Sequence, residues 1–260
     1  QGFGANIEQW RSNLSNWGQQ RPIYAVDLLA FGHSQKPAVV LGAEVWQQQV
    51  YDFGQSLIGQ PVILLGHSLG ALVALTTAAR HPDMVSRLIL LTLPLARQEL
   101  VSGWLDRLAR GVEGLFSTPL LLRPLFIVVR QPGLIRQALT NIYQGGERVD
   151  NELVELFTRP TLERGAARTL CYLVKSRTKA DFSDDIDSLI QQVSSPILLL
   201  WGLQDRILPT KWADKILALH PEITYRAIEG AGHCLYDEVP ETIDALIQDW
   251  LVQTNSNSRN

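Results

Sequence analysis

The amino-acid sequence predicts an α/β fold, in which a mostly parallel sheet carries helices on both of its faces. Two observations lead to this prediction. Short β-branched or leucine-rich runs alternate with amphipathic segments towards both ends of the chain, as expected when strands and covering helices follow one another. In addition, residues 69–79 are apolar on nearly every side and directly follow one of these runs, so a helix there must be buried against the sheet.

Five runs are predicted to form strands, with covering helices between them. The strands are expected at 21–29, 61–66, 85–92, 196–202 and 223–230. Apolar residues recur at helical spacing in two further segments, at Trp46, Val50, Phe53 and Leu57, and at Ile243, Leu246, Ile247, Trp250 and Leu251. These helices would place their apolar sides on the sheet.

The alternation of strands and helices stops in the middle of the chain. Residues 94–180 contain helical patterns and no convincing strand, and they follow the third predicted strand. We therefore expect 94–180 to form an inserted helical lid, or cap, on an α/β core built from residues 1–93 and 181–253. Residues 254–260 are polar and are expected to form a disordered tail.

The composition is that of an ordinary soluble globular chain. Its 260 residues are 46% hydrophobic and 19% charged, with a net charge of −3. There is no run of lysine or arginine, which argues against nucleic-acid binding. Cys171 and Cys234 lie far apart and form neither a disulfide framework nor a metal-ligand spacing, so we expect free, buried thiols in a reducing compartment.

No segment of the sequence is expected to cross a membrane. The longest apolar stretch, 119–129, is interrupted by Arg123 and Pro124 and is shorter than the ~20 residues that a spanning helix needs. The first residues do not resemble a signal peptide. These features predict a cytoplasmic protein, or one of the plastid stroma if the source is plant-like. Peripheral membrane contact through the lid stays open, and so does the oligomeric state.

The segment LLGHSLGAL carries the clearest chemical signal, because it runs from a predicted strand through Gly66-His67-Ser68-Leu69-Gly70 into the predicted buried helix. This arrangement is typical of a nucleophile elbow. There, a strained turn exposes a serine hydroxyl, and glycines two positions away let the strand and the helix approach closely. The alternative is a tight turn with a structural role only. The elbow predicts Ser68 as a nucleophile.

A nucleophilic serine needs a base, and an acid that orients the base. Asp205 follows the fourth predicted strand and His233 lies in a loop after the last one, which gives the chain order serine, acid, histidine. The competing acid position, after the third predicted strand, reads Leu-Pro-Leu and has no carboxylate. Asp237 and Glu238 follow His233 closely, and we expect them to serve the start of the final helix.

Together these landmarks resemble the α/β-hydrolase fold family, in its lid-bearing, esterase-like branch, over nearly the whole chain. The resemblance rests on GFGANIEQW, DLLAFGHSQKP, GHSLG, WGLQDRILP and GAGH. Within the family, AGHCLYDEVPE and the arrangement of the insertion are similar to the pheophytinase-like hydrolases of oxygenic phototrophs. The family usually has a further strand before its glycine-rich loop. That N-terminal strand is missing here, so we expect 21–29 and 61–66 to flank a gap in the sheet.

The resemblance also implies how a developing oxyanion would be held. Gly2-Phe3-Gly4 is similar to the oxyanion loop of the family. The backbone N–H groups of Phe3 and of Leu69, the residue after the nucleophile, would then be the two donors. The alternative interpretation of the loop is a flexible terminus.

The sequence thus predicts a serine hydrolase that cleaves a small hydrophobic carboxylic ester through an acyl-enzyme. Apolar residues of the insertion are expected to line the substrate pocket, among them Trp104, Leu122, Phe126 and Tyr172. Acyl transfer or carbon–carbon bond hydrolysis would use the same triad, and a hydrolase-like ligand receptor with poor turnover is a further alternative. Epoxide hydrolysis is disfavoured, because that branch of the family carries an aspartate where Ser68 stands. No dinucleotide fingerprint or metal-ligand cluster occurs, so neither a cofactor nor a metal is expected.

Overall fold

A computed structural model describes residues 1–94, 119–177 and 182–257 of the chain. In this part of the chain a sheet of four parallel strands has the order β1-β2-β3-β4. The strands are β1 (Val62–His67), β2 (Val85–Leu91), β3 (Ile197–Gly202) and β4 (Thr224–Ile228). The α/β class, the parallel sheet and four of the five predicted strands are therefore confirmed.

The central strands are apolar at consecutive positions because both faces of the sheet are covered. In β2, Leu88 and Leu90 face one hydrophobic core, whereas Ile89 and Leu91 face the other. The pairing of Leu88 with Leu64 on β1 and with Ile197 on β3 keeps the register across the sheet. Side chains alternate between the two faces of a strand, so a strand that is buried on both faces needs apolar residues at consecutive positions.

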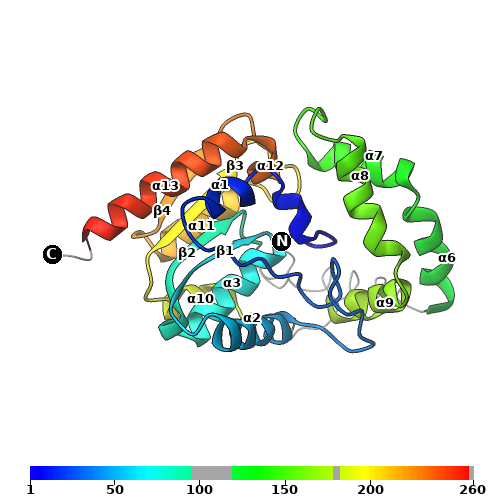
Figure 1. The fold of residues 1–260 in the computed structure, drawn as a ribbon, viewed down its shortest axis with the longest axis horizontal. Coiled ribbons are helices and arrows are strands. Elements are labelled where there is room, and N and C mark those ends of the chain that lie inside the picture. Colours follow the sequence, from blue (N-terminus) through cyan, green and yellow to red (C-terminus); the bar gives the residue numbers. More distant parts are fainter. Residues whose placement is uncertain (95–118, 178–181, 258–260) are drawn as a thin grey trace.

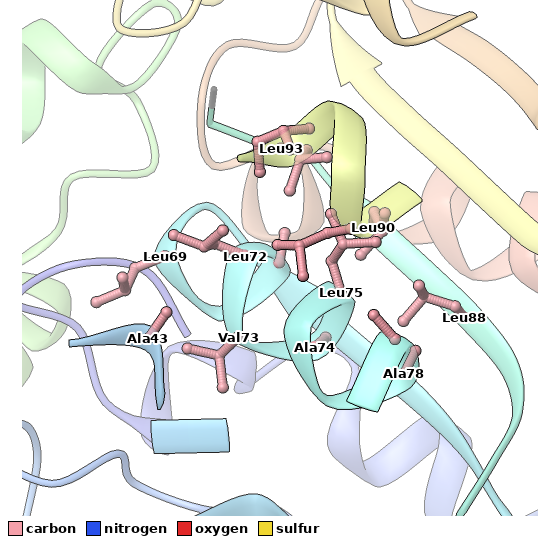
Figure 2. Close-up of a cluster of buried hydrophobic side chains, with 14 of the residues drawn as sticks. Ala43, Leu69, Leu72, Val73, Ala74, Leu75, Ala78, Leu88, Leu90 and Leu93 are labelled. Atoms are coloured by element: carbon pink, nitrogen blue, oxygen red, sulfur yellow. The ribbon is translucent and has the colours of Figure 1, made fainter. Parts of the chain in front are cut away.

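The first face of the sheet is covered by four helices, α2 (Ala43–Leu57), α3 (Leu69–Arg80), α10 (Ile186–Gln192) and α11 (Lys211–Leu219). Every residue from Leu69 to Ala79 is buried, as predicted from the apolar character of this segment. Figure 2 shows α3 side chains such as Leu72 and Leu75 in a cluster with Leu88 and Leu90 of β2. A short 3₁₀ helix, η2 (Pro82–Met84), leads from α3 into β2.

The second face is covered mainly by α13 (Pro240–Asn257), together with α12 (Leu235–Glu238), η1 (Ile7–Trp10) and α1 (Leu14–Gly18). The expectation of a disordered tail from residue 254 is wrong as far as Asn257, because α13 continues to that residue. Arg87 of β2 explains the extra turn. Its guanidinium donates to Thr254 Oγ1 at 2.8 Å and to Asn255 Oδ1 at 2.7 Å, which anchors the polar end of the helix to the sheet.

The predicted strand at 21–29 is not formed, since residues 22–28 run as irregular chain. Backbone groups near its end bond to a helix instead: the Gln49 side chain on α2 accepts from the Leu29 N–H at 2.9 Å and donates to the Asp27 carbonyl at 3.0 Å. A cavity of about 480 Å³ is lined by residues 21–26 on one side and 60–65 on the other. β1 is therefore an edge strand in the described sheet, and the predicted gap between these two segments is confirmed.

The described part of the predicted insertion is helical and contains no strand. It comprises α6 (Pro119–Val129), α7 (Pro132–Ile142), α8 (Asn151–Thr158), η3 (Arg159–Leu162) and α9 (Ala166–Arg177). Figure 1 shows these helices, drawn in green, to one side of the sheet. We refer to residues 119–177 as the helical region; its action as a lid stays a prediction. Both cysteines are buried free thiols, as expected.

Among the helices of the described residues, none has the length and apolar character that crossing a membrane requires.

Candidate active site

Ser68 lies in the turn between β1 and α3, in a backbone conformation that L-residues rarely adopt. Its φ of 52° and ψ of −118° project the side chain away from both elements. Gly66 and Gly70 make this turn feasible, because a Cβ at Gly66 would lie 2.1 Å from the Gly70 carbonyl oxygen. The Ser68 N–H donates to the Leu91 carbonyl at 2.9 Å, which fixes the turn to β2.

Asp205 lies in the turn that follows β3, and its side chain is fully buried. One carboxylate oxygen, Oδ1, accepts from the backbone N–H groups of Ile207 and Leu208, each at 2.8 Å. The other, Oδ2, lies 2.8 Å from His233 Nδ1. With both oxygens bonded, the carboxylate has one orientation, and it is aimed at the imidazole.

His233 lies in the loop after β4, and its ring is buried between Asp205 and Ser68. Its Nε2 is 3.2 Å from Ser68 Oγ. The loop can approach β3 this closely because residue 202 is glycine, where a Cβ would be 2.2 Å from the Gly232 carbonyl oxygen. With Nδ1–H donated to the Asp205 carboxylate, Nε2 carries the lone pair that can accept the Ser68 proton. The structure thus brings the three predicted residues into one hydrogen-bonded chain at the carboxyl edge of the sheet.

The Gly2-Phe3-Gly4 turn lies against the nucleophile turn. Gly70 N–H donates to the Gln1 carbonyl at 2.9 Å, and Ala5 N–H closes the turn on the Gly2 carbonyl at 3.2 Å. A Cβ at Gly2 would lie 3.5 Å from Ser68 Cβ, so this backbone is next to the hydroxyl-bearing residue. The Phe3 ring packs on Phe31, with ring centroids 5.3 Å apart. The predicted donors Phe3 and Leu69 are therefore on the two segments that meet at Ser68.

Asp27 connects the N-terminal loop, through Ile7, to the turn that follows Asp27 itself, through His33. This role was not predicted from the sequence. Asp27 Oδ1 accepts from the Ile7 N–H at 2.8 Å and its Oδ2 from the His33 N–H at 2.9 Å. Gly32 leaves the space for this, since a Cβ there would overlap the Asp27 carboxylate at 2.2 Å. The glycine at the end of DLLAFG was the available signal.

His67, adjacent to the nucleophile, was also missed. Its Nε2–H donates to the backbone carbonyl of His233 at 2.8 Å, and the two rings meet edge to face with centroids 4.8 Å apart. Complete burial lowers the pKa of His67 well below its usual value, and the nearby His233 lowers it further. His67 is therefore a neutral donor that connects the nucleophile turn to the backbone of the histidine loop.

Asp237 and Glu238 do more than begin the final helix, so that expectation is corrected. The Glu238 carboxylate accepts from the N–H groups of Gly232 and Cys234 at 2.9 Å each, and from the Gln144 N–H at 2.8 Å. Burial raises the pKa of Glu238, against the lowering effect of these three hydrogen bonds. The pattern of local sequence gave no sign of this, because Gln144 belongs to the helical region.

Asp237 makes a second connection from the same turn to the rest of the molecule. Its carboxylate is fully buried, and it pairs with Arg11 Nε at 3.2 Å. It also accepts from the Tyr143 hydroxyl at 3.0 Å. Burial raises the pKa of the Tyr143 phenol well above its usual range, so this hydroxyl keeps its proton and donates it. Asp237 and Glu238 therefore join the histidine loop to the end of α7 through Tyr143 and Gln144.

Those predicted pocket residues that the structure describes do not line the cavity beside β1. Trp104 and the side chain of Leu122 lie outside what the structure describes. Phe126 on α6 is buried and Tyr172 on α9 is partly buried. Neither lines the cavity of about 480 Å³ beside β1, and Ser68, Asp205 and His233 do not line it either. That cavity is therefore separate from the hydrogen-bonded triad.

Over the described ranges, no three His, Cys, Asp or Glu side chains are grouped closely enough to hold a metal ion.

Comparison with known proteins relates most of the chain to one fold family. A model of the alpha/beta hydrolase fold matches residues 1–240. Chloroplastic pheophytinase of Arabidopsis thaliana is 26% identical over 98% of this chain, which spans only 60% of the length of that protein. Epoxide hydrolase 3 of Xenopus tropicalis is 29% identical over 96% of this chain and 69% of its own length. A solved thermophilic esterase from Thermogutta terrifontis has a TM-score of 0.74 at 22% identity, covering 97% of this chain and 87% of that one.

Proposed function

The chain belongs to the alpha/beta hydrolase fold family, and on that premise we propose that it is a serine hydrolase that cleaves a carboxylic ester of a hydrophobic substrate. The observation that carries the proposal is the hydrogen-bonded chain from Ser68 Oγ through His233 to the buried Asp205 carboxylate, with distances of 3.2 and 2.8 Å. This arrangement provides a nucleophile, a base and a group that orients the base.

In the proposed reaction, Ser68 Oγ attacks the ester carbonyl while its proton passes to His233 Nε2. The imidazolium that forms is stabilised by the Asp205 carboxylate, whose second oxygen is held by two backbone N–H groups. When the tetrahedral intermediate collapses, His233 gives the proton to the leaving alcohol and the acyl group stays on Ser68. Water, deprotonated by His233, then attacks the acyl-enzyme; as the second tetrahedral intermediate collapses, His233 returns this proton to Ser68 Oγ, which releases the carboxylic acid and restores the enzyme.

The proposed oxyanion donors are the backbone N–H groups of Phe3 and Leu69. Support comes from the contact between the two segments, in which Gly70 N–H is bonded to the Gln1 carbonyl at 2.9 Å. Leu69 is also the first residue of α3, where the positive end of the helix dipole favours an oxyanion. Such donors stabilise the transition state most strongly when their positions are set before the reaction begins.

A hydrophobic ester is the substrate class that we propose. The names of the Arabidopsis pheophytinase and the Thermogutta esterase agree with ester chemistry, and the serine at the elbow favours acyl transfer to water over epoxide opening. Phe126 and Tyr172 of the helical region, together with Trp104 and Leu122, are the proposed pocket residues. Each substrate methylene buried there would contribute ~0.8 kcal/mol, which favours long chains over acetate.

The test is turnover of p-nitrophenyl acetate, octanoate and palmitate and of a phytyl ester in the same detergent, with fluorophosphonate labelling of the protein. We expect labelling and turnover that increase with chain length and that are lost in Ser68→Ala. Ser188→Ala, a serine on the exposed side of α10, is the matched control. Labelling of Ser68 with ester bound but not turned over would instead indicate a receptor, and a clear preference for acetate would contradict the hydrophobic substrate.

A further inference from the structure

An unusual apolar surface lies on α6 and the beginning of α7. Of residues 123–129, only Phe126 is buried. The surface, which we call the α6 surface, consists of five large apolar side chains whose exposed fractions lie between 41% and 55%: Leu125, Ile127, Val128, Val129 and Leu134. Single exposed apolar side chains are common in soluble proteins, but a run of four within five residues of one helix is a different feature and indicates an interaction site.

The position of α6 explains why these side chains are not covered by the sheet domain. Figure 1 shows α6 at the outer edge of the molecule, on the far side of the helical region from the sheet. It packs against α9, and this contact covers one side of the helix. A helix that is apolar on nearly all sides is normally enclosed by protein or lipid. The outward side of α6 has neither in the described structure.

The positive charge of the same region indicates which partner the α6 surface would bind. Residues 119–146 contain Arg123, Arg130 and Arg136 and no aspartate or glutamate, in a chain whose net charge is −3. Arg136 bonds to the Val149 carbonyl and to Asn151 Oδ1, and its charge helps to lower the pKa of Asp150, so the proposed contact with a partner rests on Arg123 and Arg130. An apolar helix beside basic side chains is the combination that binds a lipid surface with anionic headgroups.

We propose that the α6 surface docks the protein on an anionic lipid surface, with Leu125, Val128 and Val129 towards the acyl chains and the arginines among the headgroups. A second copy of the chain fits less well, because a two-fold contact would bring the same arginines of both copies together. The proposal does not depend on the ester-hydrolase function. If the protein does cleave a hydrophobic ester, docking would place it at the lipid surface where such a substrate is found. The docked region is also connected to the site, since the residue Gln144 just after α7 is bonded to Glu238, which holds the His233 loop.

The test is co-sedimentation of the chain with vesicles of phosphatidylcholine alone or mixed with phosphatidylserine. We expect binding to the mixed vesicles that weakens as salt is added, because exposed charges are screened. Leu125→Ser with Val128→Ser should weaken binding at least about tenfold by removing inserted apolar area. Arg123→Gln with Arg130→Gln should weaken it about tenfold on anionic vesicles only.

Matched controls separate the α6 surface from general stickiness. Val252 and Leu57 are 65% and 64% exposed on α13 and α2, and their serine variants should bind like the wild type, as should Arg226→Gln on β4. Thermal unfolding should be nearly unchanged in every variant, since the altered side chains are exposed or, for Arg130, partly exposed.

Equal binding by the α6 and control variants, or no binding by the wild type, would overturn the proposal. So would self-association in sedimentation experiments that the α6 variants abolish without any vesicle binding, because the surface would then be an interface between copies. Esterase activity is not a readout in these experiments, so their outcome is independent of the proposed reaction.

Discussion

Glu238 holds the two residues that flank His233: its carboxylate accepts the backbone N–H groups of Gly232 and Cys234 at 2.9 Å each. The same carboxylate accepts the N–H of Gln144 from the helical region at 2.8 Å. The imidazole is thus positioned from two directions, through its ring by Asp205 and through its backbone by Glu238. Because the second connection includes the helical region, movement of α7 would be transmitted to the proposed base.

Replacing Glu238 by alanine should destabilise the protein and slow the reaction. The change leaves three backbone N–H groups without an acceptor, and each buried unpaired amide costs ~1–3 kcal/mol, less where water enters the vacated space. We expect a loss of about 3 kcal/mol or more in the free energy of unfolding, measured with urea. In the folded fraction, kcat should fall more than KM changes, because the base rather than the binding surface is displaced.

Glu238→Gln is the conservative comparison. Its amide oxygen can accept from Gly232 and Gln144, but its NH₂ group would then face the Cys234 N–H. Stability and kcat should therefore lie between those of the wild type and of Glu238→Ala. If all three proteins have the same kcat, Glu238 does not position His233.

The raised pKa of Glu238 predicts the direction of a pH effect on stability. As pH rises, the unfolded chain releases this proton first, at the ordinary glutamate pKa, while the folded protein keeps it up to the raised value. The group therefore favours folding most at low pH, and this contribution is lost as pH rises to the raised pKa. The free energy of unfolding of the wild type minus that of Glu238→Gln should decrease over this interval and then stay constant. An increase over the same interval would show that the folded pKa is lowered.

Replacing His67 by phenylalanine should slow the reaction without preventing folding. The ring shape is retained, but the His233 carbonyl loses the Nε2–H donor at 2.8 Å. An unsatisfied buried carbonyl costs ~1–3 kcal/mol, and we expect kcat to fall about tenfold as the His233 loop shifts. His33→Phe, at a half-exposed position on a turn, is the control and should retain activity. A wild-type rate in His67→Phe would show that the hydrogen bond does not position the base.

The lowered pKa of His67 gives the opposite pH effect to that of Glu238. When pH falls through the ordinary histidine value of about 6.5, the unfolded chain binds a proton that the folded protein refuses. The wild type should therefore lose stability relative to His67→Phe as pH falls through this range, and the difference should be constant above it. Unfolding free energies measured from neutral to mildly acidic pH check the sign.

Replacing Ser68 or His233 by alanine should reduce kcat by ~10⁴–10⁶, and Asp205→Asn should cost less. The three losses should not add, since the residues act as one unit through their hydrogen bonds. Burst and steady-state kinetics with the best p-nitrophenyl ester provide the measurement. Retained turnover in Ser68→Ala would exclude it as the nucleophile.

Local sequence patterns were sufficient for much of the fold and for the three side chains of the triad. The apolar run before GHSLG, the close approach allowed by Gly66 and Gly70, and the apolar segment 69–79 all act over a few residues, so their structural consequence can be deduced without the rest of the chain. The order of Ser68, Asp205 and His233 is likewise a property of the sequence. Their meeting at one edge follows once the strands are parallel, because parallel strands end on the same side of a sheet.

Only the tertiary structure decided where the remaining polar groups find partners. Residues 22–28 have the composition of a strand, yet the neighbouring backbone groups of Asp27 and Leu29 bond to Gln49 on α2. The polar residues 254–257 have the composition of a disordered tail, yet Arg87 bonds to Thr254 and Asn255 and these residues continue α13. Glu238 and His67 acquire their roles from Gln144 and His233, far away in the chain. Each case depends on a hydrogen bond between distant segments, and a buried polar group must take whichever partner the packing of the elements brings within reach.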